Sequence, residues 1–174
     1  MTMVLDGSGL TTTGVPNSGT AQASTSGTAI TFTGIPSGVK RITVMFSGVA
    51  LSGSANLLIQ FGVSGTPVTS GYIAGQAYAL NNGSVVGGLN STSGFPIQYG
   101  VNTYSLQGSI AFTLLNASTN AWTGSGTFYN PNTAPYTGMT AGTVTLSGTP
   151  NQIRVYTTNG TDTFTAGSIN ILYE

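Results

Sequence analysis

The stretch from Ala29 to Leu51 limits the folds open to this chain more than any other part of the sequence. Two short segments in it alternate apolar side chains with hydroxyl-bearing or charged ones, and a period of two is typical of a β-strand with one buried face. The second segment places Ile42, Val44 and Phe46 on one face. Between the segments, residues 34–38 read Gly-Ile-Pro-Ser-Gly, which is typical of a turn. We therefore expect two strands joined by a turn.

The same alternation recurs along the rest of the chain. Similar segments lie at residues 56–62, 103–116, 152–157 and 168–173, and no segment has a helical period. About nine or ten short strands, with turn signals between them, predict an all-β fold, an antiparallel β-sandwich of jelly-roll-like form. We expect residues 85–100 to form a long loop with a short strand near Ile97, and residues 130–138 to form an exposed loop.

The first 28 residues differ from the remainder because they are rich in Gly, Ser and Thr and contain few apolar residues. Val4, Leu5 and Leu10 are the apolar residues that could anchor this segment. We interpret residues 1–28 as an arm for attachment or strand exchange, and residues 29–174 as the β-sandwich domain. A disordered leader is the alternative interpretation.

Charge is scarce, and its scarcity excludes several classes of partner. Only 3% of the 174 residues are charged, and three basic residues balance three acidic ones. No basic patch for nucleic acid is expected, and no apolar run is long enough for membrane insertion as a helix. The N-terminus lacks the features of a signal peptide, so we expect synthesis in a cytoplasm.

Chemistry that depends on titratable groups also has little support in the sequence. There is no histidine and no cysteine, and the carboxylates are Asp6, Asp162 and Glu174. We therefore expect no enzyme activity, no metal site and no cofactor. We expect Lys40 or Arg41 to form a structural ion pair with Asp162 or Glu174. An intersubunit pair or a contact to an anionic partner is the alternative.

Aromatic and amide residues near the loop at 130–138 are the candidate binding residues. Tyrosine and tryptophan on polar loops can stack on a sugar and also form hydrogen bonds. The alternative is that they line the rim of the sandwich or subunit contacts. The candidate ligand-binding residues are Trp122, Tyr129, Asn130, Asn132 and Tyr136.

The segment from Ile30 to Val49, followed by Ser52 to Gly62, resembles a widespread family of virion proteins of tailed bacteriophages that are often described as tail-fibre-like. Residues 4–9, Val-Leu-Asp-Gly-Ser-Gly, also look like the opening of many phage fibre proteins. The resemblance implies a β-sandwich displayed on the virion, usually in a trimer, without a catalytic motif. We expect neither a long shaft nor an anchor domain in this chain, which favours a fibre tip or a small decoration protein.

Taken together, these features predict a non-enzymatic phage protein on the particle surface, made in the host cytoplasm. The first expectation is a tail-fibre-like, receptor-binding homotrimer that contacts other virion proteins and a host surface glycan. The alternative is a head decoration protein that stabilises the capsid. A carbohydrate-active enzyme is a third hypothesis.

Overall fold

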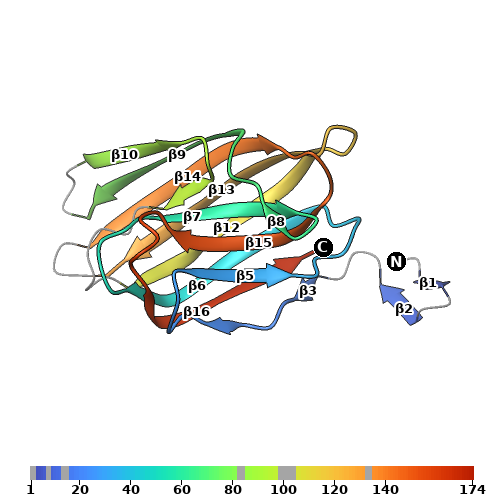
Figure 1. Cartoon of the computed structure of the whole chain (residues 1–174), viewed down its shortest axis with the longest axis horizontal. Coiled ribbons are helices and arrows are strands. Elements are labelled where there is room, and N and C mark those ends of the chain that lie inside the picture. The colour runs from blue at the N-terminus through green and yellow to red at the C-terminus, as the bar shows by residue number, and fades with distance from the viewer. Residues whose placement is uncertain (1–2, 7–8, 13–15, 82–84, 98–104, 132–134) are drawn as a thin grey trace.

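The structure, a computed structural model, describes residues 3–6, 9–12, 16–81, 85–97, 105–131 and 135–174. It contains two antiparallel sheets packed face to face, together with a separate two-stranded sheet near the N-terminus (Figure 1). The predicted all-β antiparallel sandwich is therefore confirmed.

The large sheet has nine strands and the small sheet has five. In spatial order, the large sheet contains β10 (Val85–Ser91), β9 (Tyr72–Leu80), β14 (Tyr136–Thr145), β13 (Ala121–Asn130), β12 (Leu106–Asn116), β6 (Arg41–Leu51), β16 (Phe164–Tyr173) and β3 (Asn17–Ser18), with β4 (Gln22–Ala23) also paired to β16. The small sheet contains β11 (Phe95–Ile97), β7 (Leu57–Val63), β15 (Pro150–Thr157) and β5 (Ala29–Thr33), with β8 (Thr66–Pro67) paired to β7.

The predicted apolar faces form the core between the two sheets. Ile42, Val44 and Phe46 of β6 are buried, and β7 and β15 contribute the facing side chains. Aromatic rings fill the centre, where Phe61 packs edge-on against Phe112 with ring centroids 5.2 Å apart. Gly124 lies directly against the Phe112 ring, so a Cβ at this position would collide with the ring. This glycine therefore makes room for the aromatic core.

Three boundaries differ from the sequence-based expectations, and one expected strand is confirmed. Residues 85–91 form β10 instead of a loop, because pairing with β9 satisfies the glycine-rich backbone. The short strand near Ile97 is confirmed as β11. β14 begins at Tyr136, so the loop expected over residues 130–138 is shorter. The last strand, β16, begins at Phe164, before the segment expected at residues 168–173, and register shifts interrupt its pairing with β6.

The N-terminal segment contributes to two structures. β3 and β4 pair with β16 at the edge of the large sheet. Before them, β1 (Met3–Asp6) and β2 (Gly9–Thr12) form a hairpin in which Leu5 lies opposite Leu10. Figure 1 shows this hairpin beside the sandwich, near the end where the C-terminus lies.

Candidate functional site

Two of the predicted binding residues, which flank the predicted binding loop, are buried in the sandwich. Asn130 and Tyr136 lie opposite each other where β13 and β14 meet the loop, and they are 0% and 2% exposed. The Asn130 side-chain nitrogen donates a hydrogen bond to the Tyr136 hydroxyl at 2.5 Å. The expectation that these two side chains are exposed for ligand binding is therefore wrong. Asn132 lies outside the described residues.

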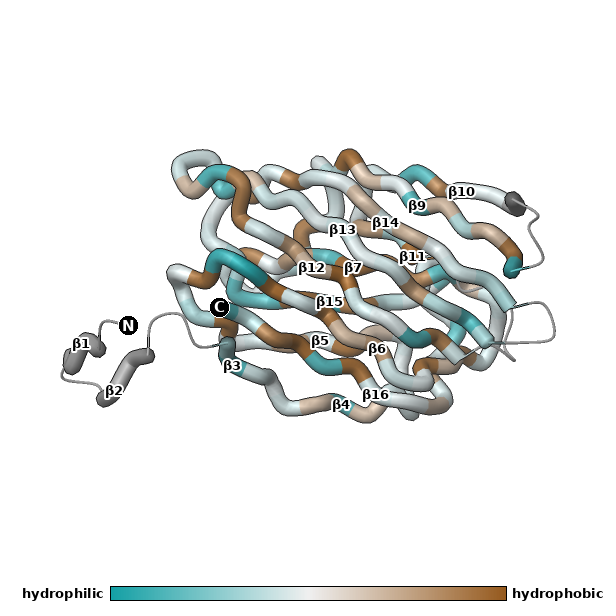
Figure 2. The backbone as a smooth tube through the Cα atoms, turned by 180° about the vertical axis from the view of Figure 1, so that it is seen from behind, coloured by the Kyte–Doolittle hydropathy of each residue, from teal (hydrophilic) through white to brown (hydrophobic). Residues whose placement is uncertain are grey.

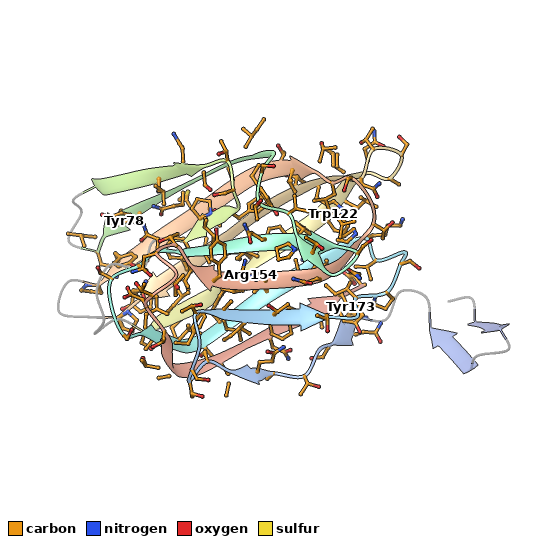
Figure 3. The ribbon with its side chains drawn as sticks, viewed as in Figure 1. Tyr78, Trp122, Arg154 and Tyr173 are labelled. Carbon is orange, nitrogen blue, oxygen red and sulfur yellow. The ribbon has the colours of Figure 1, made fainter. Side chains whose placement is uncertain are left out.

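Trp122 also belongs to the core, with only 1% of its surface exposed. Its ring packs against Phe61 with centroids 5.3 Å apart, so neither face of the indole is available for stacking on a sugar. In β13, Trp122 shares its side of the sheet with Phe128 and Asn130, because each lies an even number of residues from the others. That alternation was the sequence signal that these side chains point inward. Figure 3 shows Trp122 towards one end of the sandwich and Tyr78 towards the other.

Tyr129 is the one candidate aromatic residue in the described loop region that remains accessible, with 37% exposure. It lies on the outward side of β13, opposite Thr137 and Gln107 on the neighbouring strands. These residues line a shallow hollow of about 130 Å³. Tyr129 is therefore available for a contact on the outer face of the large sheet.

The predicted ion pairs are confirmed in part. Arg41 pairs with Glu174, with Nη1 and Oε1 3.4 Å apart, which confirms an ion pair between β6 and the C-terminal residue. Asp162 does not pair with Lys40 or Arg41 in the described part of the chain, so that option is wrong. Its carboxylate accepts a hydrogen bond from the Ala55 backbone nitrogen at 2.8 Å and thereby joins two loops.

Arg154 is the remaining basic residue, labelled in Figure 3, and its alternation with buried Ile153 and Val155 places it on the outward side of the small sheet. Its guanidinium carbon lies 4.5 Å from the centroid of the Tyr156 ring. One guanidinium nitrogen is 3.5 Å from the side-chain oxygen of Gln60. A cation held over an aromatic ring in this way is stabilised by the ring's quadrupole.

The predicted arm residues lie in the hairpin. Val4 and Leu5 are in β1 and Leu10 is in β2. Their backbones pair with each other in a sheet of two strands, separate from the sandwich sheets. The role of these residues in attachment stays a prediction.

The structure reveals a surface that the sequence analysis did not identify. We name it the open face: the outward side of β9, β14, β13 and β12. The large apolar residues that the structure describes as exposed all lie on these strands, and they are Ile73 at 79%, Leu115 at 66%, Met139 at 62% and Tyr129 at 37%. Figure 2, drawn from the large-sheet side, shows these strands mostly in pale and brown tones.

The open face is indented between its exposed apolar residues, because the side chains there are small. Gly75, Ala77 and Ala141 line a depression of about 550 Å³, with Met139 at its border. A second depression of about 580 Å³ adjoins it and includes Ile73. Across the sheet, Gly75 is in register with Ala141, Ser125, Ala111 and Thr43, a row without charge. The alternation of Ile73, Gly75 and Ala77 with buried neighbours was the sequence signal for this surface.

The described residues contain no group of three or more His, Cys, Asp or Glu side chains placed to hold a metal ion. They also include no helix of the length and apolarity that a membrane span requires.

Within the core, burial raises the pKa of Tyr72 far above its usual range, so its hydroxyl stays neutral.

Comparisons with protein-family models, with curated proteins and with solved structures found no match to this chain.

Proposed function

We propose that this chain is a non-enzymatic structural protein on the surface of a tailed-bacteriophage particle, tail-fibre-like in kind, and that it works as a homotrimer. The resemblance of residues 30–62 to phage virion proteins supports the phage assignment. The open face supports a role through contact with other protein surfaces, and it is the observation that carries this proposal.

The physical argument rests on the exposure of Ile73 and Met139. These side chains are 79% and 62% exposed on one sheet face, beside depressions floored by glycine and alanine. Exposed large apolar side chains gathered on one sheet face are typical of an interaction site. The row from Gly75 to Thr43 carries no charged side chain, so a partner surface would bury no uncompensated charge there.

A second copy of the chain meets these requirements, because only 3% of its residues are charged. In the proposed trimer, each copy turns its open face towards the threefold axis. The hairpin of β1 and β2 then remains available for attachment to another virion protein. Other virion proteins and a host surface glycan are the further proposed partners.

The assembly test uses analytical ultracentrifugation at micromolar concentration. The wild-type protein should sediment as a trimer, and a double variant with Ile73→Asp and Met139→Asp should sediment as a monomer with an unchanged far-ultraviolet circular dichroism spectrum. Thr33→Asp is the matched control, because it adds the same charge to an exposed position of the small sheet. A monomeric wild type, or a double variant that remains trimeric, contradicts the proposal.

A head decoration protein is the second candidate. It is favoured by the burial of Trp122, Asn130 and Tyr136, which removes the predicted sugar-stacking surface. Immunogold labelling of purified virions distinguishes the two candidates, since a tail-fibre-like protein should be labelled at the tail and a decoration protein over the head. Absence of label on the particle would contradict both.

A further inference from the structure

The two edges of the large sheet differ in how the chain closes them. At one edge, β3 and β4 pair with β16, so the chain itself covers that strand. At the other edge, β10 pairs with β9, and the described residues provide no strand on its outer side. The backbone N–H and C=O groups on the outer side of an edge strand can pair with a strand from another chain.

β10 is the longest edge strand of the sandwich, with seven residues, whereas β5 and β11 at the edges of the small sheet have five and three. Natural edge strands are usually protected by charged side chains, by proline or by their shortness. On β5, the Thr31 carbonyl already accepts a hydrogen bond from the Gln22 side chain at 3.0 Å. β10 has neither charge nor proline, and after a bulge its residues 87–91 pair with β9 in regular register. The outer edge of β10 therefore suits an added strand.

The N-terminal hairpin is the part of the chain that lacks neighbouring strands. β1 and β2 have four residues each and pair with each other, and among the described residues neither pairs with a strand of the sandwich. A hairpin of two strands is only marginally stable in water, and further strands stabilise it. The backbone groups on its two outer edges can therefore gain from pairing with another sheet edge.

The hairpin is tethered far from β10 of its own chain. Residues 13–16 join it to β3, and they span no more than about 18 Å when fully extended. β3 and β10 lie at opposite edges of the large sheet, seven strand spacings or roughly 34 Å apart. Figure 1 also shows the hairpin and β10 at opposite ends of the molecule. A contact between the hairpin and β10 therefore joins two copies of the chain.

We propose that the β1–β2 hairpin of one copy adds to the β10 edge of the neighbouring copy, a contact that requires the homotrimer proposed above. The added strand pairs with residues 87–91 through the backbone, so the large sheet continues from one subunit into the next. Two different surfaces meet in this contact, and such a contact can close into a threefold ring, whereas β10 paired with a second β10 gives a twofold dimer. One outer edge of the hairpin forms the contact, and the other stays available for another virion protein.

Cross-linking of the full-length chain tests this contact, because the sequence contains no cysteine. Thr11→Cys places a thiol on β2, and Asn90→Cys places one on β10, where the native side chain is exposed. With a short bismaleimide, the double variant should give products of two and three chains on a denaturing gel. The matched control combines Thr11→Cys with Thr158→Cys, which lies in an exposed turn after β15, and it should remain as single chains.

Hydrogen exchange gives a second readout without a cross-linker. The backbone amides of residues 87–91 should exchange at least about tenfold more slowly in the wild-type trimer than in the monomeric variant with Ile73→Asp and Met139→Asp. The amides of β6 should be equally protected in both proteins.

Sedimentation separates the failure of this contact from the failure of the trimer. If the double cysteine variant sediments as a trimer and gives no product larger than one chain, the hairpin contact is overturned and the trimer stands. A monomeric wild type overturns both proposals. Cross-linked products from Asn90→Cys alone would show that β10 pairs with a second β10, which also overturns the hairpin contact.

Discussion

The outer faces of the two sheets are built from the same alternating pattern but differ in how far their side chains are exposed to solvent. On the small sheet, Gln60 and Leu58 point away from the core, yet they are only 1% and 5% exposed. On the large sheet, Ile73 and Met139 also point away from the core and are 79% and 62% exposed. The chain covers the outer side of β7 itself and leaves Ile73 and Met139 of the large sheet exposed.

The cover of the small sheet comes from the connection between β10 and β11. The Gln60 side-chain nitrogen donates a hydrogen bond to the Ser93 carbonyl at 2.7 Å. Gly94 follows and lies so close to β7 that a Cβ there would be 3.2 Å from the Leu58 Cβ. Arg154 lies over the Tyr156 ring, and one of its guanidinium nitrogens is near the Gln60 side chain on β7. An outward position is therefore not the same as an exposed one.

The largest expected effect is at Gln60. Gln60→Ala leaves the Ser93 carbonyl without its side-chain donor and opens a cavity beneath the covering loop, so the free energy of unfolding should fall by about 2–3 kcal/mol. Urea denaturation measures this change. Thr127→Ala, on the open face, is the matched control and should change the stability by less than about 0.5 kcal/mol. Equal losses of unfolding free energy in the two variants would show that the outer side of β7 is no more tightly packed than the open face.

The next effect concerns Tyr72, which is buried directly beside exposed Ile73. Its hydroxyl accepts a hydrogen bond from the Phe61 backbone nitrogen at 2.9 Å, so Tyr72→Phe should cost about 1–2 kcal/mol. Because burial raises the folded-state pKa of Tyr72 above its unfolded value, its contribution is complete below about pH 10 and is lost as the pH rises further. The alkaline decline in thermal midpoint should therefore be shallower for Tyr72→Phe. An unchanged slope would contradict this assignment.

Arg154 gives a smaller expected effect. Arg154→Met removes the guanidinium from the Tyr156 ring and keeps an apolar stem, so the loss should be about 0.5–1 kcal/mol in urea denaturation. Arg154→Lys keeps the charge without the planar group and should lose less than Arg154→Met. A stabilised Arg154→Met variant would show that burying this cation is unfavourable.

The smallest expected effect is at Arg41, whose partner is Glu174 at the edge of the large sheet. The two side chains are 54% and 32% exposed, so water screens their attraction. Arg41→Met should change the unfolding free energy by less than about 0.5 kcal/mol, and the change should vanish at high salt. If Arg41→Met lowers the unfolding free energy by more than Arg154→Met does, the expected order of these two arginines is wrong.

How far the sequence predicts this molecule depends on the environment of each strand. The alternation of Ile42, Val44 and Phe46 predicts their burial correctly, because β6 has one apolar face. The rule fails for Gln60, which a distant loop covers and which alternation alone would place in solvent. It also fails for residues 85–91, where pairing with β9 overrides the high glycine content.

The candidate site shows the same limit. Trp122 and Tyr136 were assigned to binding because they flank a loop with prolines, although their alternation with Phe128 was consistent with burial. The Arg41–Glu174 pair was predicted from the scarcity of charge, since few alternative partners exist. The bond from Ala55 to Asp162 could not be predicted, because it depends on the close approach of two loops distant in sequence.

The place of β16 in the large sheet has a consequence for how the chain folds as it is synthesised. β6 needs β12 on one side and β16 on the other, and residues 164–173 are made more than a hundred residues after β6. Until then, the backbone groups along that edge of β6 have no strand of their own chain to pair with. Late pairing between such distant segments slows folding and favours aggregation of incomplete chains. The nascent chain is therefore most vulnerable just before β16 emerges from the ribosome.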